Sequence, residues 1–150
     1  MNFTKLYKNM QNKFLQYLDA QIQLEMKMSA TSDGKRLTGL RNIKSDFAYE
    51  ITKKDAKPFL DIINQMYKTR QETSKIYKDV NMDLYLQEQI ELKILEPFAP
   101  KEVSQNEVFD FLNTTDIEKS RKNFKKFQEK CYEKFGYTIP SNIILEYLNS

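Results

Sequence analysis

Apolar residues recur along most of the chain at alternating spacings of four and three, which places them on one face of an α-helix. The first such run predicts a long amphipathic helix from Phe3 to Met28. Its stripe consists of Phe3, Tyr7, Met10, Phe14, Tyr17, Leu24 and Met28, widened by Leu15, Leu18 and Ile22. After the turn-forming sequence SATSDG at 29–34, a second helix is expected from Lys35 to Thr52. Its inward residues are Leu37, Leu40, Ile43, Phe47 and Ile51.

The spacing between Pro58 and Pro100 is the most informative, because charged residues occupy apolar positions there. It predicts a third helix that begins at Pro58, a break near 79–82, and a fourth helix closed by Pro97 and Pro100. The third stripe is Phe59, Ile63, Met66, Arg70, Thr73, Tyr77 and Val80, and the fourth is Leu84, Glu88, Glu91 and Leu95. A buried charge is tolerated only when it is paired. We therefore expect a structural ion pair between Arg70 and Glu88 or Glu91.

After Pro100 the sequence predicts a smaller lobe of three helices. Ser104-x-x-Glu107 and Thr115-x-x-Glu118 have the form of capping boxes, so helices are expected at about 105–113 and 116–135. Gly136 is expected to end the second helix in a left-handed conformation, and Pro140 to open the last one. The fold class is therefore all-α, with an N-terminal helical bundle at 1–99 and a three-helix C-terminal lobe at 100–150.

Several of these residues carry a resemblance to a known family. The residues in question are Lys35 to Ser45 in the second helix, then Lys68-x-Arg70-x-Glu72-Thr73, Asp83-Leu84, Glu88, Glu91, Ile94-Leu95 and the ending Phe98-x-Pro100. In this spacing the chain resembles the GatB/YqeY family. That family comprises stand-alone helical proteins and the tail domain of the B subunit of the aspartyl/glutamyl-tRNA amidotransferase. The resemblance implies the same bundle and lobe. The chain departs from the family pattern at Asn123-Phe124-Lys125, where an acidic residue, methionine and glycine are common.

The composition removes most kinds of catalytic site. The sequence has no histidine, one cysteine and three glycines, so it lacks a histidine base, a glycine-rich phosphate loop and the ligand clusters that hold zinc. Glu88 and Glu91 are spaced like paired catalytic carboxylates, but Arg70 favours a structural role for them. We expect no catalytic residue, no metal site and no cofactor. The resemblance links the chain to a glutamine-dependent carbon–nitrogen ligase, whose activities would lie on other chains.

Lysines provide the candidate binding surface. In the helix expected at 116–135, they recur on the side opposite Phe127 and Cys131, at Lys119, Lys122, Lys126, Lys130 and Lys134. Such a face can follow a phosphate backbone, although charge runs are also typical of a solvated surface. The start of the second helix adds Lys35, Arg36 and Lys44 as candidates for RNA contact.

Three functions remain open at this stage. The first is a non-catalytic protein that binds tRNA or another structured RNA, the second a protein-interaction module of a larger assembly, and the third an accessory part of an amidotransferase. The chain has no apolar run of the roughly 20 residues that a membrane span needs and no secretory segment after Met1. We therefore expect a cytoplasmic protein without a membrane partner.

Overall fold

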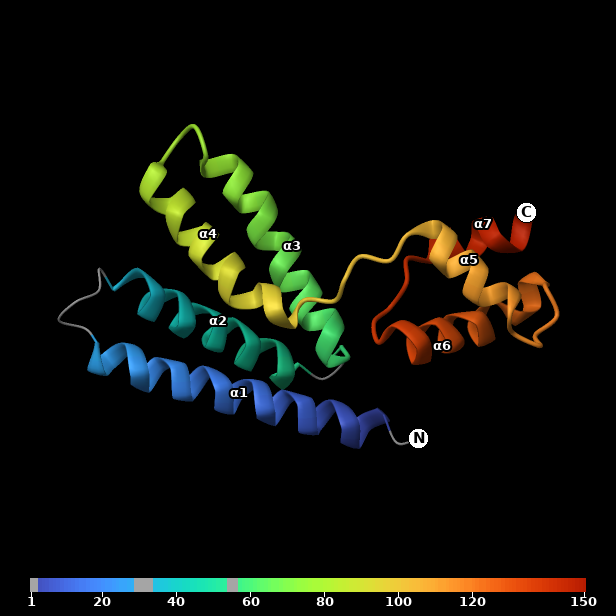
Figure 1. Ribbon diagram of the computed structural model, residues 1–150, viewed down its shortest axis with the longest axis horizontal. Helices are drawn as coiled ribbons and strands as arrows, with labels where there is room; N and C mark the ends of the chain where they lie inside the picture. The colour runs from blue at the N-terminus through green and yellow to red at the C-terminus, as the bar shows by residue number, and fades with distance from the viewer. Residues whose placement is uncertain (1–2, 29–33, 54–56) are drawn as a thin grey trace. The chain divides into compact units, whose positions relative to one another are not determined.

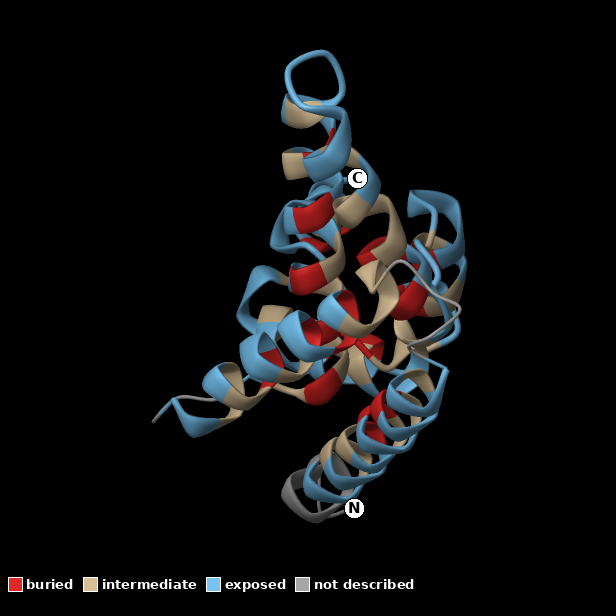
Figure 2. Ribbon diagram, turned by 90° about the vertical axis from the view of Figure 1, so that its left-hand side faces the viewer, coloured by how far each residue is buried: buried red, intermediate tan, exposed pale blue. Residues whose placement is uncertain are grey.

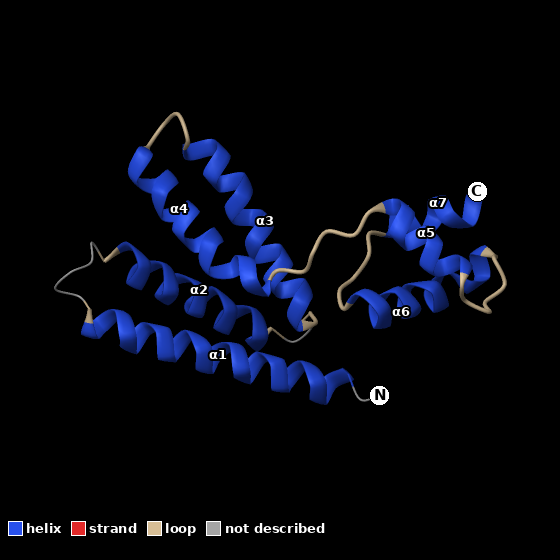
Figure 3. Cartoon of the chain, in the orientation of Figure 1, coloured by secondary structure: helices blue, strands red, loops and turns tan. Residues whose placement is uncertain are grey.

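The computed structural model describes residues 3–28, 34–53 and 57–150, with seven α-helices, two short 3-10 helices and no strand in these ranges (Figures 1 and 3). The all-α expectation is confirmed. The chain divides into two compact units, residues 1–99 and 100–150. The turn expected at 29–34 lies outside the described residues except for Gly34.

The first unit consists of two helical pairs. α1 (Phe3–Lys27) lies beside α2 (Lys35–Thr52), and α3 (Phe59–Tyr77) lies beside α4 (Met82–Leu95), which continues into a 3-10 turn, η1 (Glu96–Phe98) (Figure 1). The pairs meet mainly where α2 contacts α4. The core between them is apolar and contains Phe14, Leu18, Ile22, Leu40, Ile43, Phe47, Phe59, Ile62, Ile63, Met66, Ile94 and Leu95.

Local signals set most of the helix ends in this unit. α2 has the predicted bounds, and Pro58 precedes the first residue of α3, where its missing N–H costs no hydrogen bond. The break between α3 and α4 is closed by Asn81, whose side chain accepts a hydrogen bond from the Leu84 N–H at 3.1 Å. Three phenylalanines from three helices, Phe14, Phe47 and Phe59, then contact one another edge to face in the core.

Four of the described side chains assigned to the buried stripes are exposed, whereas those of Phe3 and Tyr7 lie outside the description. Leu24 and Met28 are 51% and 55% accessible, because the end of α1 meets the start of α2 through polar pairing of Arg36 with Glu25. Val80 and Leu84 are 80% and 43% accessible. Gln87 of α4 contacts Lys35, the first residue of α2. The residues that precede Gln87, including the turn between α3 and α4, therefore extend past the end of α2 and are exposed (Figure 2).

The second unit packs three helices around a small core of Val108, Leu112, Phe127, Cys131, Ile144 and Tyr147. α5 (Gln105–Asn113) begins at Ser104, whose hydroxyl accepts from the Glu107 N–H at 3.2 Å, as the capping box predicts. α6 (Phe124–Phe135) ends at Gly136 with φ of 80°, and α7 (Ser141–Asn149) follows Pro140. Both of these ends are confirmed.

The helix expected at 116–135 is wrong in its first half. Residues 115–120 are not helical, and η2 (Arg121–Asn123) leads into α6. Thr115 does not cap a helix, because its hydroxyl donates back to the Leu112 carbonyl at the end of α5. The Asn123 amide donates to the Glu118 carbonyl. Such side-chain bonds to the backbone compete with a helix, and they hold this segment in a turn.

Candidate functional site

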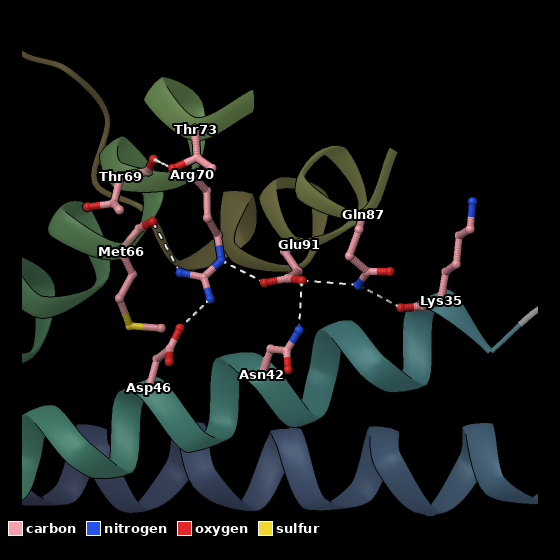
Figure 4. A network of polar contacts seen from close by, with 9 residues as sticks. All are labelled: Lys35, Asn42, Asp46, Met66, Thr69, Arg70, Thr73, Gln87 and Glu91. Carbon is pink, nitrogen blue, oxygen red and sulfur yellow. Dashed lines mark hydrogen bonds and ion pairs between the residues drawn. The ribbon is translucent and has the colours of Figure 1, made fainter. Parts of the chain in front are cut away.

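A buried polar network joins α2, α3 and α4 (Figure 4). Arg70 is 7% accessible and Glu91 is 4% accessible. The Arg70 Nε donates to Glu91 Oε1 at 2.9 Å, and its Nη2 donates to Asp46 Oδ2 at 2.6 Å. The third guanidinium nitrogen, Nη1, reaches the Met66 carbonyl at 3.4 Å. A planar guanidinium thus connects carboxylates from two other helices.

The second oxygen of Glu91 is also occupied. It accepts from Asn42 Nδ2 at 3.2 Å and from Gln87 Nε2 at 3.0 Å. Gln87 in turn donates to the Lys35 carbonyl at 3.0 Å, in the first turn of α2 (Figure 4). No buried side-chain nitrogen or oxygen among the described residues is left without a hydrogen bond. The Glu91 carboxylate is therefore compensated in charge and saturated with donors, which is the condition for burying it.

The structure brings together one of the two predicted pairs and adds a partner. Glu91 contacts Arg70, whereas Glu88 makes no ion pair within the described chain. Burial first, then the charges of Glu91 and Asp46, raise the pKa of Glu88, although Arg70 lowers it. Asp46 was missed. Its sequence signal is the spacing of four from Asn42, which puts both polar residues on one face of α2 beside Ile43.

Gly39 explains how closely α2 and α4 approach. A Cβ atom at this position would lie 3.1 Å from Glu91 Cγ and 3.3 Å from Ile94 Cδ1. The close contact of α2 at Gly39 is therefore with α4. Any larger residue would require the Glu91, Gln87 or Ile94 side chain to shift by a few tenths of an ångström, whereas glycine allows this approach without displacement.

The polar groups of the network bind one another within the first unit. Its buried nitrogen and oxygen atoms all have hydrogen-bond partners, and the described residues contain no group of three or more histidine, cysteine or acidic side chains that could hold a metal ion. Cys131 is fully buried in the second unit, and burial raises the pKa of its thiol to about 11. Its thiolate is therefore scarce at neutral pH, which does not suit a nucleophile.

The lysines predicted on one helical face are divided by the shorter α6. Lys126, Lys130 and Lys134 are exposed on α6, Lys122 lies in η2, and Lys119 precedes it. Lys119 donates to the Ser150 hydroxyl and lies 4.6 Å from the centre of the Tyr147 ring. Lys122 and Lys130 form loose ion pairs of 3.9 and 3.7 Å with Glu118 and Glu133. Pairs this exposed contribute at most about 1 kcal/mol and are readily exchanged.

Two of the three candidates on α2, Arg36 and Lys44, form short ion pairs, and the third, Lys35, forms a loose one. Arg36 pairs with Glu25 at 2.8 Å, Lys44 pairs with Asp19, and Lys35 lies 3.8 Å from Asp83. Each of these cations faces a carboxylate of a neighbouring helix, so this surface presents little net positive charge.

Comparison with known proteins identifies the family of the chain. Two helical pairs followed by a three-helix unit define an all-α protein in the described ranges. The family model described as Yqey-like protein matches residues 16–130, which is most of the chain. The chain therefore belongs to the YqeY-like protein family, and the resemblance noted in the sequence is confirmed at that level. No curated protein matches it. None of the described helices is both long and apolar enough to cross a membrane.

Proposed function

We propose that this chain is a cytoplasmic, non-catalytic protein that binds tRNA or another structured RNA through the basic surface at residues 119–134. One observation carries the proposal. Seven of the eight basic residues of the second unit fall in this short segment, together with only two acidic ones. The unit as a whole is neutral, so its positive charge is concentrated on α6 and the turn before it.

The orientation of α6 supports the same function. Phe127 and Cys131 are fully buried, while Lys125, Lys126 and Lys130 are exposed. RNA helices are recognised mostly by shape and phosphate contacts, and this surface offers charge without needing an aromatic motif. The resemblance to the tail domain of the aspartyl/glutamyl-tRNA amidotransferase B subunit supports tRNA as the RNA.

The test is a salt titration of tRNA binding, measured by filter binding with the wild type and two triple variants. Replacing Lys122, Lys126 and Lys130 by glutamine should weaken binding and lower the slope of log affinity against log salt by roughly three units. The matched control replaces Lys8, Lys13 and Lys27, which are exposed on α1, and changes the net charge equally. It should bind nearly as the wild type does.

Two results would reject this function. One is no tRNA binding by the wild type at low salt, and the other is equal loss in both triple variants. Glutamine is a good helix former, so a circular dichroism spectrum should confirm that each variant remains folded.

A second candidate function, a protein-interaction module, is favoured by the exposed tip of the α3–α4 pair. The apolar side chains Ile76, Val80, Met82, Leu84 and Leu86 are each at least 41% accessible there. Five exposed apolar residues between positions 76 and 86 favour a protein contact in this part of the first unit. A pull-down with the wild type and with Ile76→Ser/Val80→Ser as baits, after ribonuclease treatment, tests it. A partner protein that both baits retain equally would exclude the tip of the α3–α4 pair as its binding surface.

A further inference from the structure

A groove of about 490 Å³ runs between α3 and α4. Gln89 of α4 contributes to it, whereas Glu91 faces α2. Residues two apart in a helix point to nearly opposite sides, so the groove lies on the side of α4 that is turned away from the buried network. Its buried lining residues are Ser74 and Leu92, which are 3% and 8% accessible. The groove is thus distinct from the polar network and belongs entirely to the first unit.

The groove has an uncompensated positive charge. It is lined by Lys75 of α3, Lys78 directly after α3 and Lys93 of α4, with Glu96 as the one acidic lining residue. Within the part of the chain that the structure describes, none of these three lysines forms an ion pair. They differ in this from Lys35, Arg36 and Lys44 on α2. Three free ammonium groups around one concave surface favour a ligand with a phosphate group.

Aromatic and amide side chains line the same groove. Tyr67 of α3 and Tyr85 of α4 are both partly buried lining residues. Gln89 donates through its Nε2 to the Ser74 hydroxyl, which fixes the orientation of its amide. Gln71 is an exposed second amide in the lining. Tyrosine rings provide a face for a base, and amides can bond its edges, so these groups suit a nucleobase.

Two other cavities contain carboxylates, and a third, of about 230 Å³, is lined by Tyr17, Arg36 and Lys93 but is smaller than the usual small-molecule site. The cavity of about 510 Å³ in the second unit is lined by Lys130 and Lys134 but also by Asp116 and Glu133, so its charges cancel. The cavity beside Arg70 measures about 240 Å³ and contains Asp46 and Glu50. Small-molecule sites are usually between about 300 and 1,000 Å³, a range that the α3–α4 groove satisfies.

We propose that the groove between α3 and α4 binds a nucleoside phosphate, with the phosphate near Lys75, Lys78 and Lys93 and the base against Tyr67 or Tyr85. The ligand is either a free nucleotide or an unpaired nucleotide of an RNA. Binding of an RNA nucleotide rests on the proposed RNA-binding function and would add an RNA contact on the first unit. The first case is independent of it.

The experiment titrates the full chain with AMP, UMP, adenosine, inorganic phosphate and a six-nucleotide single-stranded RNA at low salt. Binding is followed by the NMR signals of the tyrosine rings. We expect the nucleoside monophosphates to bind at least tenfold more tightly than adenosine or inorganic phosphate, and to shift the Tyr67 and Tyr85 signals. Tighter binding of the oligonucleotide than of UMP would assign the groove to RNA, and the reverse order would assign it to free nucleotides.

One triple variant tests the proposed site, and two others serve as controls. Replacing Lys75, Lys78 and Lys93 by glutamine should weaken AMP binding at least tenfold, whereas the Lys8, Lys13 and Lys27 triple variant should leave it unchanged. The triple variant of Lys122, Lys126 and Lys130 should also keep AMP binding, so that loss of tRNA binding and loss of this site are distinguishable. Absence of binding by both the nucleotides and the oligonucleotide would overturn the proposal. Binding of phosphate as tight as that of AMP, or an equal loss in the control variant, would overturn it as well.

Discussion

Gly39 of α2 lies directly against Glu91 of α4, and a Cβ atom at Gly39 would be 3.1 Å from the Glu91 Cγ atom. The Glu91 carboxylate cannot move aside freely, because Arg70, Asn42 and Gln87 all donate hydrogen bonds to it. The contact thus couples the backbone of one helix to the buried charge of another.

This contact predicts that Gly39→Ala destabilises the first unit. Alanine gains about 1 kcal/mol in helix propensity over glycine, but overpacking costs about 1 to 3 kcal/mol at a site that cannot relax. We expect a net loss, measured as a lower midpoint of urea unfolding, and a larger loss for Gly39→Val. Ser45→Ala is the control, at an exposed position of the same helix, and should change the midpoint little. A stabilised Gly39→Ala variant would show that α4 gives way.

The buried pair predicts a large effect of Arg70→Ala. It leaves the Glu91 charge buried without a cation, which costs about 3 to 5 kcal/mol of unfolding free energy. Asp46→Asn should cost less than about 1 kcal/mol, because the Asp46 side chain is 56% accessible. The measurement is chemical denaturation at pH 7.

A double variant separates charge burial from loss of packing. Replacing Arg70 by methionine and Glu91 by leucine removes both charges and keeps similar volume, which is often close to neutral. The remaining partners are exposed or partly exposed and can bond water. We expect the double variant to be clearly more stable than Arg70→Ala. Equal instability of the two would mean that shape, and not charge, dominates at this position.

The raised pKa of Glu88 predicts a pH dependence of folding stability that is opposite in sign to that of an ordinary ion-paired carboxylate. Its pKa in the folded chain is raised, chiefly by burial, so the folded state binds more protons than the unfolded state between about 4.5 and the raised pKa. Stability from this group therefore falls as pH rises through that window. Glu88→Gln should raise the melting temperature at pH 7, and the difference should vanish near pH 4. A variant that melts lower than the wild type at pH 7 would contradict the sign.

Cys131 predicts slow thiol chemistry in the folded protein. Burial raises the pKa of the thiol from 9.0 to about 11, which lowers the thiolate fraction about 100-fold near pH 8. The reaction of the native chain with an aromatic disulfide reagent should therefore be limited by unfolding. In guanidinium chloride the same reaction should be complete within the mixing time. Fast reaction of the native chain would show that the second unit opens readily.

The fold was predictable where a local signal decides the outcome. Pro58, Ser104 and Gly136 act on their own turn of the chain, and each marks a helix end in the structure. The segment at 115–123 was not predictable in this way. The capping box expected at Thr115 competes with a hydrogen bond from the Asn123 side chain to the Glu118 carbonyl, which favours a turn. The sequence does not show which of two local motifs wins.

The polar centre was predictable in part. An arginine within an apolar stripe required a carboxylate partner, and the sequence offered two on the next helix. Arg70 pairs with Glu91 rather than Glu88, and also with Asp46, because of the way in which three helices pack together. The spacing of residues within one helix carries no information about that packing. The exposure of Val80 likewise depends on where α2 begins relative to α4.

The network between α2 and α4 also acts against wrong alignments of the two helical pairs. If α4 slid along α2 by one turn, about 5.4 Å, the leucines and isoleucines would still find apolar neighbours. Glu91 would not find its donors again, and its charge would be buried without compensation. A core made only of aliphatic side chains would tolerate several such alignments at similar free energy. The buried carboxylate penalises all but one of them, so it contributes more to the uniqueness of this four-helix arrangement than to its total stability.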